Sequence, residues 1–204
     1  MARPRSGSRD QLVERAMHVF WQNGFSATSM EDLVSATGVG RGAIYSDFGG
    51  KEELFLACLS AYRNSIAESA LETLTSGQRG LDAIESYFDF FIGLHKKRGM
   101  PGPGCFFANV MTDIAPKHVE VRRKIREHQK DLQRGFYDVL KQAAEECGST
   151  VSHEDLNDLA ALTVVSSQGL WSYARSITDV MTLERFKRRF VAVLNAQLCA
   201  AREE

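Results

Sequence analysis

Apolar residues recur at intervals of three and four positions along almost the whole 204-residue chain, which is the spacing of one face of an α-helix. Gly24 ends the first of these runs, because glycine tolerates the left-handed conformation that closes many helices. The run consists of Leu12, Val13, Ala16, Met17, Phe20 and Trp21. Strand-like alternation bounded by hairpin turns is missing from the sequence. The pattern therefore predicts an all-α protein.

The expected helix starts are marked by a Ser or Thr cap, which at Ser8, Thr28 and Ser152 is followed three residues later by a residue that completes it. We expect caps at Ser8, Thr28, Ser152 and Thr182. Gly38 stops the second helix after about two turns, and Gly49 and Gly50 interrupt the chain after the third. The pattern predicts about nine helices. Residues 1–50 are expected to form a three-helix domain, and residues 51–204 a larger helical domain.

Composition narrows the class of protein. The formal net charge is −1, 44% of the residues are hydrophobic and 25% are charged, as in ordinary globular domains. No stretch approaches the roughly 18 uninterrupted apolar residues of a membrane span. Arginines near the N-terminus are not followed by the apolar run of a secretory signal. The four cysteines lack C-x-x-C or zinc-finger spacing, so we expect reduced thiols, no metal site and no cofactor in a cytoplasmic protein.

Gly38, Gly40 and Ala43 spell G-x-G-x-x-A, the fingerprint of a loop that binds a dinucleotide pyrophosphate. That fingerprint needs a strand before it and an acidic residue about 20 positions after it. The preceding segment has helical spacing instead, and residues 58–63 contain no acid. A glycine turn between two short helices is the signature of a helix–turn–helix, which we predict here.

The segment TSMEDLVSATGVGRGAIYSDFGGKEEL, residues 28–54, resembles the N-terminal signature of the TetR family of bacterial transcriptional regulators. The matching residues are Thr28, Asp32, Leu33, Gly38, Val39, Gly42, Ile44, Tyr45, Phe48, Lys51, Glu52 and Leu54. Gly40 departs from the pattern, because the family often has Ser or Thr there. The resemblance implies a ligand-responsive DNA-binding regulator and not an enzyme. Its usual form is a dimeric repressor that releases a palindromic operator when a small molecule or reactive electrophile acts on the C-terminal domain.

The resemblance also assigns residues to DNA. Arg41 is the candidate for base readout, since its fork can bind guanine O6 and N7 together, with phosphate contact as the alternative. Tyr45 is expected to bind phosphate, unless it is purely structural. The N-terminal arginines Arg3, Arg5 and Arg9 form a basic arm that follows the DNA backbone or enters the minor groove, with an idle, solvated arm as the alternative. The predicted DNA-contacting residues are Thr28, Ser29, Arg41, Gly42, Ala43, Tyr45, Ser46 and Lys51.

The C-terminal part is expected to bind the effector, because aromatic residues with polar residues among them are typical of small-molecule sites. The candidate residues are Phe88, Phe91, Cys105, Phe106, Asn109, His128, Gln168 and Trp171. Core packing is the alternative for each aromatic. Cys105 begins a predicted helix, where a lowered thiol pKa would favour a sensor of electrophiles; the alternative is a buried small hydrophobe.

The expected partners are a double-stranded DNA operator, a small-molecule effector and a second copy of the chain that pairs through the last two helices. An enzyme is the main rival class, but the sequence lacks a G-x-S-x-G elbow, an H-E-x-x-H motif and a P-loop. A plain helical interaction domain would not explain the spacing of residues 28–54.

Overall fold

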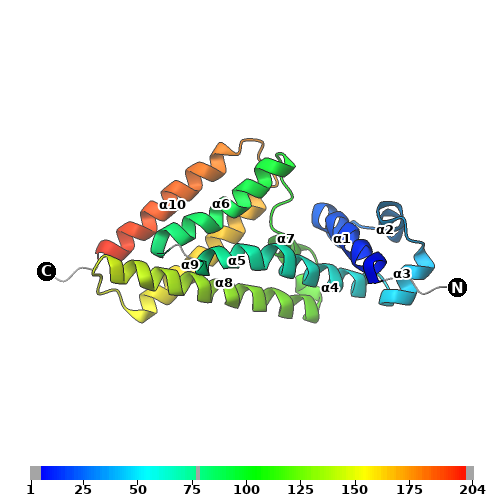
Figure 1. Cartoon of the computed structure of the whole chain (residues 1–204), viewed down its shortest axis with the longest axis horizontal. Helices are drawn as coiled ribbons and strands as arrows, with labels where there is room; N and C mark the ends of the chain where they lie inside the picture. Colours follow the sequence, from blue (N-terminus) through cyan, green and yellow to red (C-terminus); the bar gives the residue numbers. More distant parts are fainter. Residues whose placement is uncertain (1–5, 77–78, 201–204) are drawn as a thin grey trace. The chain divides into compact units, whose positions relative to one another are not determined.

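The computed structural model describes residues 6–76 and 79–200, and all regular elements among them are helical. This confirms the all-α prediction. The N-terminal arginines Arg3 and Arg5 lie outside the described residues. The α-helices labelled in Figure 1 are α1 (Ser6–Asn23), α2 (Met30–Thr37), α3 (Arg41–Phe48), α4 (Lys51–Tyr62), α5 (Glu68–Thr75), α6 (Gly80–Arg98), α7 (Phe106–Asp113), α8 (Val119–Glu146), α9 (His153–Tyr173) and α10 (Met181–Ala200).

A π-helical segment, Arg63–Ala67, joins α4 to α5 without a break. When α4, this segment and α5 are counted as one helix, the described part of the chain has nine α-helices, as expected. The chain divides into two compact units. The first unit is Met1–Ile66 with Cys105–Ile125, and the second unit is Ala67–Gly104 with Arg126–Glu204. The functional boundary expected at residue 50 is a different division and stays a prediction.

The core of the first unit is aromatic. Phe20 of α1 meets Phe55 of α4 with ring centroids 5.0 Å apart, and Phe55 meets Phe106 of α7 at 5.7 Å. Trp21 and Tyr62 pack edge to face at 5.0 Å. All five rings are buried. Edge-to-face pairs add about 0.5–1.5 kcal/mol each beyond the area that they bury, so this cluster fixes α1, α4 and α7 to one another.

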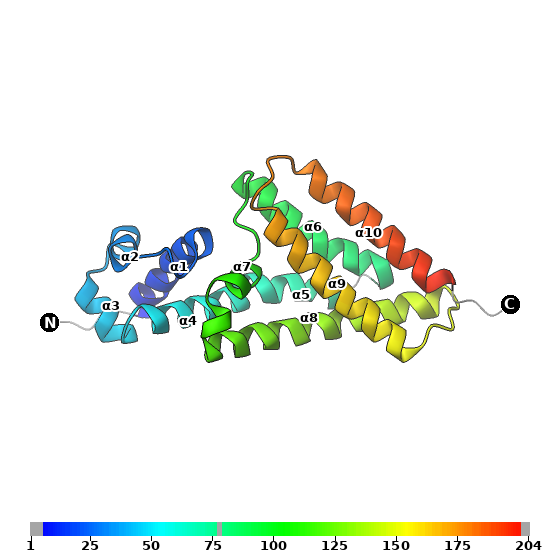
Figure 2. The ribbon, with the colours of Figure 1, turned by 180° about the vertical axis from the view of Figure 1, so that it is seen from behind.

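The core of the second unit is a separate aromatic cluster centred on α6. Tyr87 contacts Phe136 of α8 at 5.0 Å, and Phe91 contacts Trp171 of α9 at 4.8 Å. Phe88 reaches Phe190 of α10 at 6.0 Å. Figure 2 shows α6 beside α10 in this unit. Phe88, Phe91 and Trp171 are therefore part of the core of this unit, which was the alternative to a role in effector binding.

Three expected helix starts are wrong by one to three residues. Helix α1 begins at Ser6, before the cap expected at Ser8. Ser29, not Thr28, caps α2: its hydroxyl accepts from the Asp32 amide at 3.1 Å, and Asp32 accepts from the Ser29 amide at 2.8 Å.

Helix α10 begins at Met181, whose amide donates to Asp179 at 2.9 Å, so the cap expected at Thr182 lies inside the helix. A nearby carboxylate is the stronger acceptor and moves the start in that direction. The cap at Ser152 is confirmed, because its hydroxyl accepts from the Asp155 amide.

His95 is a buried histidine in the second unit, stacked on Trp171 with ring centroids 5.8 Å apart. Its Nδ1 lies 2.8 Å from the Phe91 carbonyl oxygen, which only accepts, so Nδ1 carries the proton. Its Nε2 is buried without a hydrogen-bond partner. Burial lowers the pKa of His95, the bond to Phe91 opposes this, and the charge of Arg98 reinforces it. The folded protein therefore holds His95 neutral.

We predict that the free energy of unfolding falls as the pH drops below about 6.5, the ordinary histidine pKa, because the unfolded chain then binds a proton that folded His95 resists. Denaturant unfolding between pH 7.5 and 5 measures this dependence. The variant His95→Gln should flatten it, while His153→Gln, at an exposed histidine, serves as the control. An unchanged pH dependence in His95→Gln would contradict the account.

Candidate nucleic-acid interface

The turn between α2 and α3 has the geometry of a helix–turn–helix. Gly38 ends α2 with φ 70°, and its amide donates to the Val34 carbonyl at 2.9 Å. Val39 is half-buried in the turn, and Gly40 precedes α3 without a side-chain cap. Leu33 of α2 and Ile44 of α3 are fully buried. Gly38 is therefore needed because the end of α2 requires a positive φ. Gly38 and Gly40 both lie between two helices.

Helix α3 presents a continuous exposed side. Arg41, Gly42, Ala43 and Ser46 are exposed, Tyr45 is partly exposed, and Ile44 and Phe48 face the core. A Cβ atom at Gly42 would meet open space, so the position is bare. In a helix–turn–helix, the second helix enters the major groove, and this side of α3 is the surface that could do so. Five of the predicted DNA-contacting residues thus share one surface.

Arg41 makes only weak contacts that DNA can replace. Its guanidinium lies 3.3 Å from the Glu31 carboxylate of α2, and the two side chains are 59% and 75% exposed. The guanidinium carbon is 5.8 Å from the centre of the Tyr45 ring. An exposed pair of this kind contributes about 0–1 kcal/mol. Arg41 can therefore turn toward a base edge or a phosphate at small cost.

Lys51 begins α4 and lies over an aromatic ring. Its ammonium is 4.3 Å from the centre of the Phe25 ring, a cation–π contact. Burial lowers the pKa of Lys51, and the charges of Asp113 and Asp32 raise it in opposition. Gly50 precedes the helix without a side-chain cap, so the first amides of α4 remain available to an anion.

The hydroxyls of Thr28 and Ser29 already make hydrogen bonds within the protein. Thr28 is buried, and its hydroxyl donates to the Gly24 carbonyl at 2.6 Å. The Ser29 hydroxyl donates to Asp32 at 2.7 Å while it caps α2. The hydrogen bonds from Ser29 also lower the pKa of Asp32. Phosphate contacts through these two hydroxyls stay predictions, and DNA would have to replace the existing bonds.

The predicted effector residues fall in both units. The second unit contains Phe88, Phe91, His128, Gln168 and Trp171, and the first unit contains Cys105, Phe106 and Asn109. In the second unit, both amide atoms of Gln168 and the Trp171 Nε1 are buried without hydrogen-bond partners. His95 joins this set through its unpartnered Nε2, although sequence reasoning missed it. Its position four residues after Phe91, on the same face of α6, was the available signal.

Cys105 precedes α7 as its N-cap and is only 1% exposed. Burial raises the pKa of its thiol, against the opposing hydrogen bonds from Tyr62 and from the first amides of α7. The Tyr62 hydroxyl lies 3.5 Å from the sulfur. The expected lowering of the pKa by the helix N-terminus is therefore wrong, because desolvation is the larger effect.

The described residues form neither a metal-binding cluster nor a membrane-spanning helix. Residues 6–76 and 79–200 contain no group of three or more His, Cys, Asp or Glu side chains placed to bind a metal ion. None of the helices in these ranges has the length and apolarity needed to cross a bilayer.

Comparisons with known proteins agree with the helix–turn–helix formed by α2 and α3. The family described as "Bacterial regulatory proteins, tetR family" matches residues 12–58. The family described as "Tetracyclin repressor-like, C-terminal domain" matches residues 80–190. The chain is 30% identical over 174 residues to the HTH-type transcriptional repressor ComR of Escherichia coli K12, covering 85% of this chain and 82% of ComR.

The chain is also 25% identical over 185 residues to the HTH-type transcriptional regulator YezE of Bacillus subtilis 168, covering 90% and 94% of the two chains. A solved structure of the TetR-family regulator CifR with a 26-bp operator superposes with a TM-score of 0.79 at 22% identity, covering 93% of this chain and 98% of CifR. The chain belongs to the TetR family of transcriptional regulators. It is thus a DNA-binding regulator with an N-terminal helix–turn–helix, and its family is not one of enzymes.

We predict different DNA-binding defects for Lys51→Met and Arg41→Met. Each lysine that contacts phosphate adds about 0.9 to the salt slope of the logarithm of the binding constant. In a dimer, Lys51→Met removes two such contacts, so it should lower the slope by about 1.8 and weaken binding to all duplexes alike. Arg41→Met should weaken the operator by about 1–3 kcal/mol more than an unrelated duplex. Fluorescence anisotropy at several salt concentrations measures both.

Lys141→Met removes an exposed lysine of α8 and serves as the control for the lost charge. An unchanged salt slope in Lys51→Met would exclude the phosphate contact. If Arg41→Met weakened binding to the operator and to the unrelated duplex equally, Arg41 would contact phosphate and not a base.

Proposed function

We propose that the protein is a dimeric repressor that binds a palindromic DNA operator and releases it when a small molecule binds the C-terminal domain. The observation that carries the proposal is the bare, exposed side of α3 with Arg41 at its start and Gly42 next to it. The relative ComR, named a repressor, supports repression over activation. A regulator of this kind acts on the nucleoid in the cytoplasm.

Exposed apolar and small residues on α9 and α10 support dimerisation. Leu162 and Val165 of α9 are 47% and 69% exposed, and Val193 of α10 is 51% exposed. Gly169, Ala196 and Ala200 continue these stripes at helical spacing. One groove is lined by residues of both helices, among them Leu159, Leu162, Gln197 and Ala200. Such a surface is typical of a self-complementary interface between two copies.

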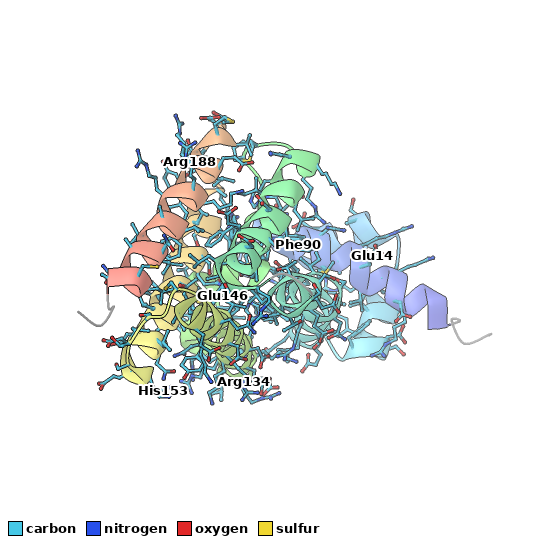
Figure 3. All side chains as sticks on the ribbon, turned by 60° about the vertical axis from the view of Figure 1, so that its left-hand side comes forward. Glu14, Phe90, Arg134, Glu146, His153 and Arg188 are labelled. Carbon is cyan, nitrogen blue, oxygen red and sulfur yellow. The ribbon has the colours of Figure 1, made fainter. Side chains whose placement is uncertain are left out.

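Not every apolar residue of α9 and α10 is available to a partner. Leu170 and Leu194 are buried inside the protomer and serve its core. Arg188 of α10 is exposed and labelled in Figure 3. A dimer of this kind would place two α3 helices on half-sites about 34–36 Å apart, or a multiple of that spacing.

The buried polar atoms of the second unit favour a noncovalent effector. Each unpartnered buried donor or acceptor costs about 1–3 kcal/mol, which a ligand can offset by bonding to it. Gln168 offers a donor and an acceptor, Trp171 a donor and His95 an acceptor. The Trp171 ring lies against the rings of Phe88, Phe91 and His95. These groups suit an uncharged aromatic or alicyclic molecule that carries a hydroxyl or amide.

Effector binding must favour a conformation that binds DNA poorly, because a ligand shifts an equilibrium only by its differential affinity for the two states. The continuous helix from Lys51 through Thr75 runs from the predicted phosphate contact into the second unit. It is the element through which we expect the two functions to be linked.

We predict that the protein shifts a duplex taken from upstream of its own gene and binds it as a dimer. Light scattering at micromolar concentration should give twice the chain mass of 22.7 kDa. The variant Val165→Glu should reduce both the mass and operator affinity, because it buries a charge in the interface between the two copies. Gln142→Glu, on α8, adds the same charge elsewhere and should change neither. A monomeric wild type would overturn the proposed dimer.

We predict that iodoacetamide labels Cys147 and Cys199 faster than Cys105 in the native protein. These two cysteines are partly exposed, whereas Cys105 is buried with a raised thiol pKa. Mass spectrometry of peptides at timed intervals measures the rates, and Cys58, also buried, is the internal control. If Cys105 were labelled fastest, the electrophile-sensing alternative would replace the noncovalent effector.

A further inference from the structure

The last residue of α7 caps the corner between α1 and α2. The Asp113 Oδ2 atom accepts from the Phe25 amide at 2.6 Å and from the Ser26 amide at 3.3 Å. The Asp113 Oδ1 atom accepts from the Ser26 hydroxyl at 2.5 Å. All three residues belong to the first compact unit. One carboxylate, more than 80 positions away in sequence, thus satisfies three donors of the corner.

The backbone of the corner is built for close approach of this carboxylate. Gly24 ends α1 with φ 83°, and a Cβ atom there would lie 2.8 Å from the Asp113 Oδ2 atom. Only glycine therefore fits at position 24. Hydrogen bonds to an ionised acceptor are about twice as strong as bonds between neutral groups. Asp113 therefore fixes the path of the chain from α1 into α2, the first helix of the helix–turn–helix.

The same corner contains Phe25, whose ring contacts the Lys51 ammonium. The Phe25 ring packs against Phe55 with centroids 4.9 Å apart, and the Lys51 ammonium lies 4.3 Å from the centre of the Phe25 ring. The Asp113 charge also acts on Lys51 directly. Asp113 thus orients Lys51 in two ways, through the position of Phe25 and through its charge.

Other contacts fix α7 and the segment after it to the same unit. The Asn109 Nδ2 donates to the Trp21 carbonyl at 3.3 Å, and Lys124 donates to the Ser60 hydroxyl at 2.9 Å. His118 pairs with Glu52 in the first turn of α4. Asp113 is consequently held in place from both sides along the chain, as a group that positions other residues must be.

We propose that Asp113 is a positioning residue for DNA binding: it fixes the α1–α2 corner and orients Lys51 toward the phosphate backbone. The residue lies outside residues 12–58, the range that matches the DNA-binding family. The inference rests on the proposed phosphate contact of Lys51. A change at α7 that withdraws Asp113 would loosen the corner and weaken operator binding without touching α3.

The test compares Asp113→Asn with Asp138→Asn, which removes the same charge at an exposed position of α8. An asparagine can keep the geometry of the corner but loses the negative charge that strengthens the bonds from the Phe25 and Ser26 amides, so Asp113→Asn should weaken binding of the upstream duplex by about tenfold. Asp138→Asn should bind like the wild type. Binding within twofold of the wild type for Asp113→Asn would overturn the proposal.

A double-mutant cycle with Lys51→Met separates positioning from a general structural role. If Asp113 acts through Lys51, Asp113→Asn should cost no more than about threefold in the Lys51→Met background. Losses that multiply independently would refute the action of Asp113 through Lys51. The milder variant Ser26→Ala removes only the hydroxyl bond to Asp113, keeps both amide bonds and should weaken binding by about two- to fivefold. Wild-type affinity in Ser26→Ala would count against the proposal.

Hydrogen exchange in the free protein provides a readout that does not depend on DNA. The Phe25 and Ser26 amides should exchange about tenfold faster in Asp113→Asn than in the wild type. Unchanged exchange would overturn the cap itself. A wild-type protein that failed to bind the upstream duplex would instead contradict the proposed operator, while the exchange rates would still decide the role of Asp113.

Discussion

Burial of aromatic rings between α1, α4 and α7 is the constraint on which the DNA-reading unit depends. Phe55 is fully buried, and its ring meets Phe20, Phe25 and Phe106 at centroid distances of 4.9–5.7 Å. Removal of such a ring from a core costs about 3–5 kcal/mol, a large part of a domain's stability. Helix α3 has only two buried side chains, Ile44 and Phe48, so it depends on this larger cluster for a fixed position.

Bulk charge contributes little to DNA binding here. The formal net charge is −1, and Arg41 faces Glu31 across the α2–α3 turn. Affinity must therefore come from a few well-placed groups, used twice in the proposed dimer. This gives positioning contacts an unusual weight, because a displaced lysine is not compensated by a general positive field. The Asp113 carboxylate fits that requirement, since it holds the corner and lies near Lys51 without adding positive charge.

Local signals carried most of what could be predicted. Gly38 and the apolar spacing around it predicted the turn, and the resemblance of residues 28–54 supplied the family. Prediction failed where a contact joins distant segments or where neighbouring groups compete. Thr28 was expected as the cap of α2, but its hydroxyl bonds to Gly24 and leaves Ser29 to cap the helix. Asp113 gave no signal, because its partners at Phe25 and Ser26 are brought to it only by the fold.

The fate of Cys105 and His95 illustrates the same limit. Position at a helix start left Cys105 open between a reactive thiol and a buried small hydrophobe, and burial, which sequence spacing does not reveal, raises its pKa. His95 was not among the predicted effector residues, although burial leaves its Nε2 without a partner beside Trp171. Electrostatic environment is a property of the packed molecule. Chemical reactivity was therefore the part of the site that sequence reasoning predicted least well.

Hydroxyl-radical footprinting of the upstream DNA tests the central claim most directly, namely that two copies of α3 read a palindromic operator. Two α3 helices predict two protected patches related by a twofold axis, with centres separated by about 10–10.5 bp or a multiple of that spacing. A single protected patch, or protection without sequence preference along the duplex, would contradict the account.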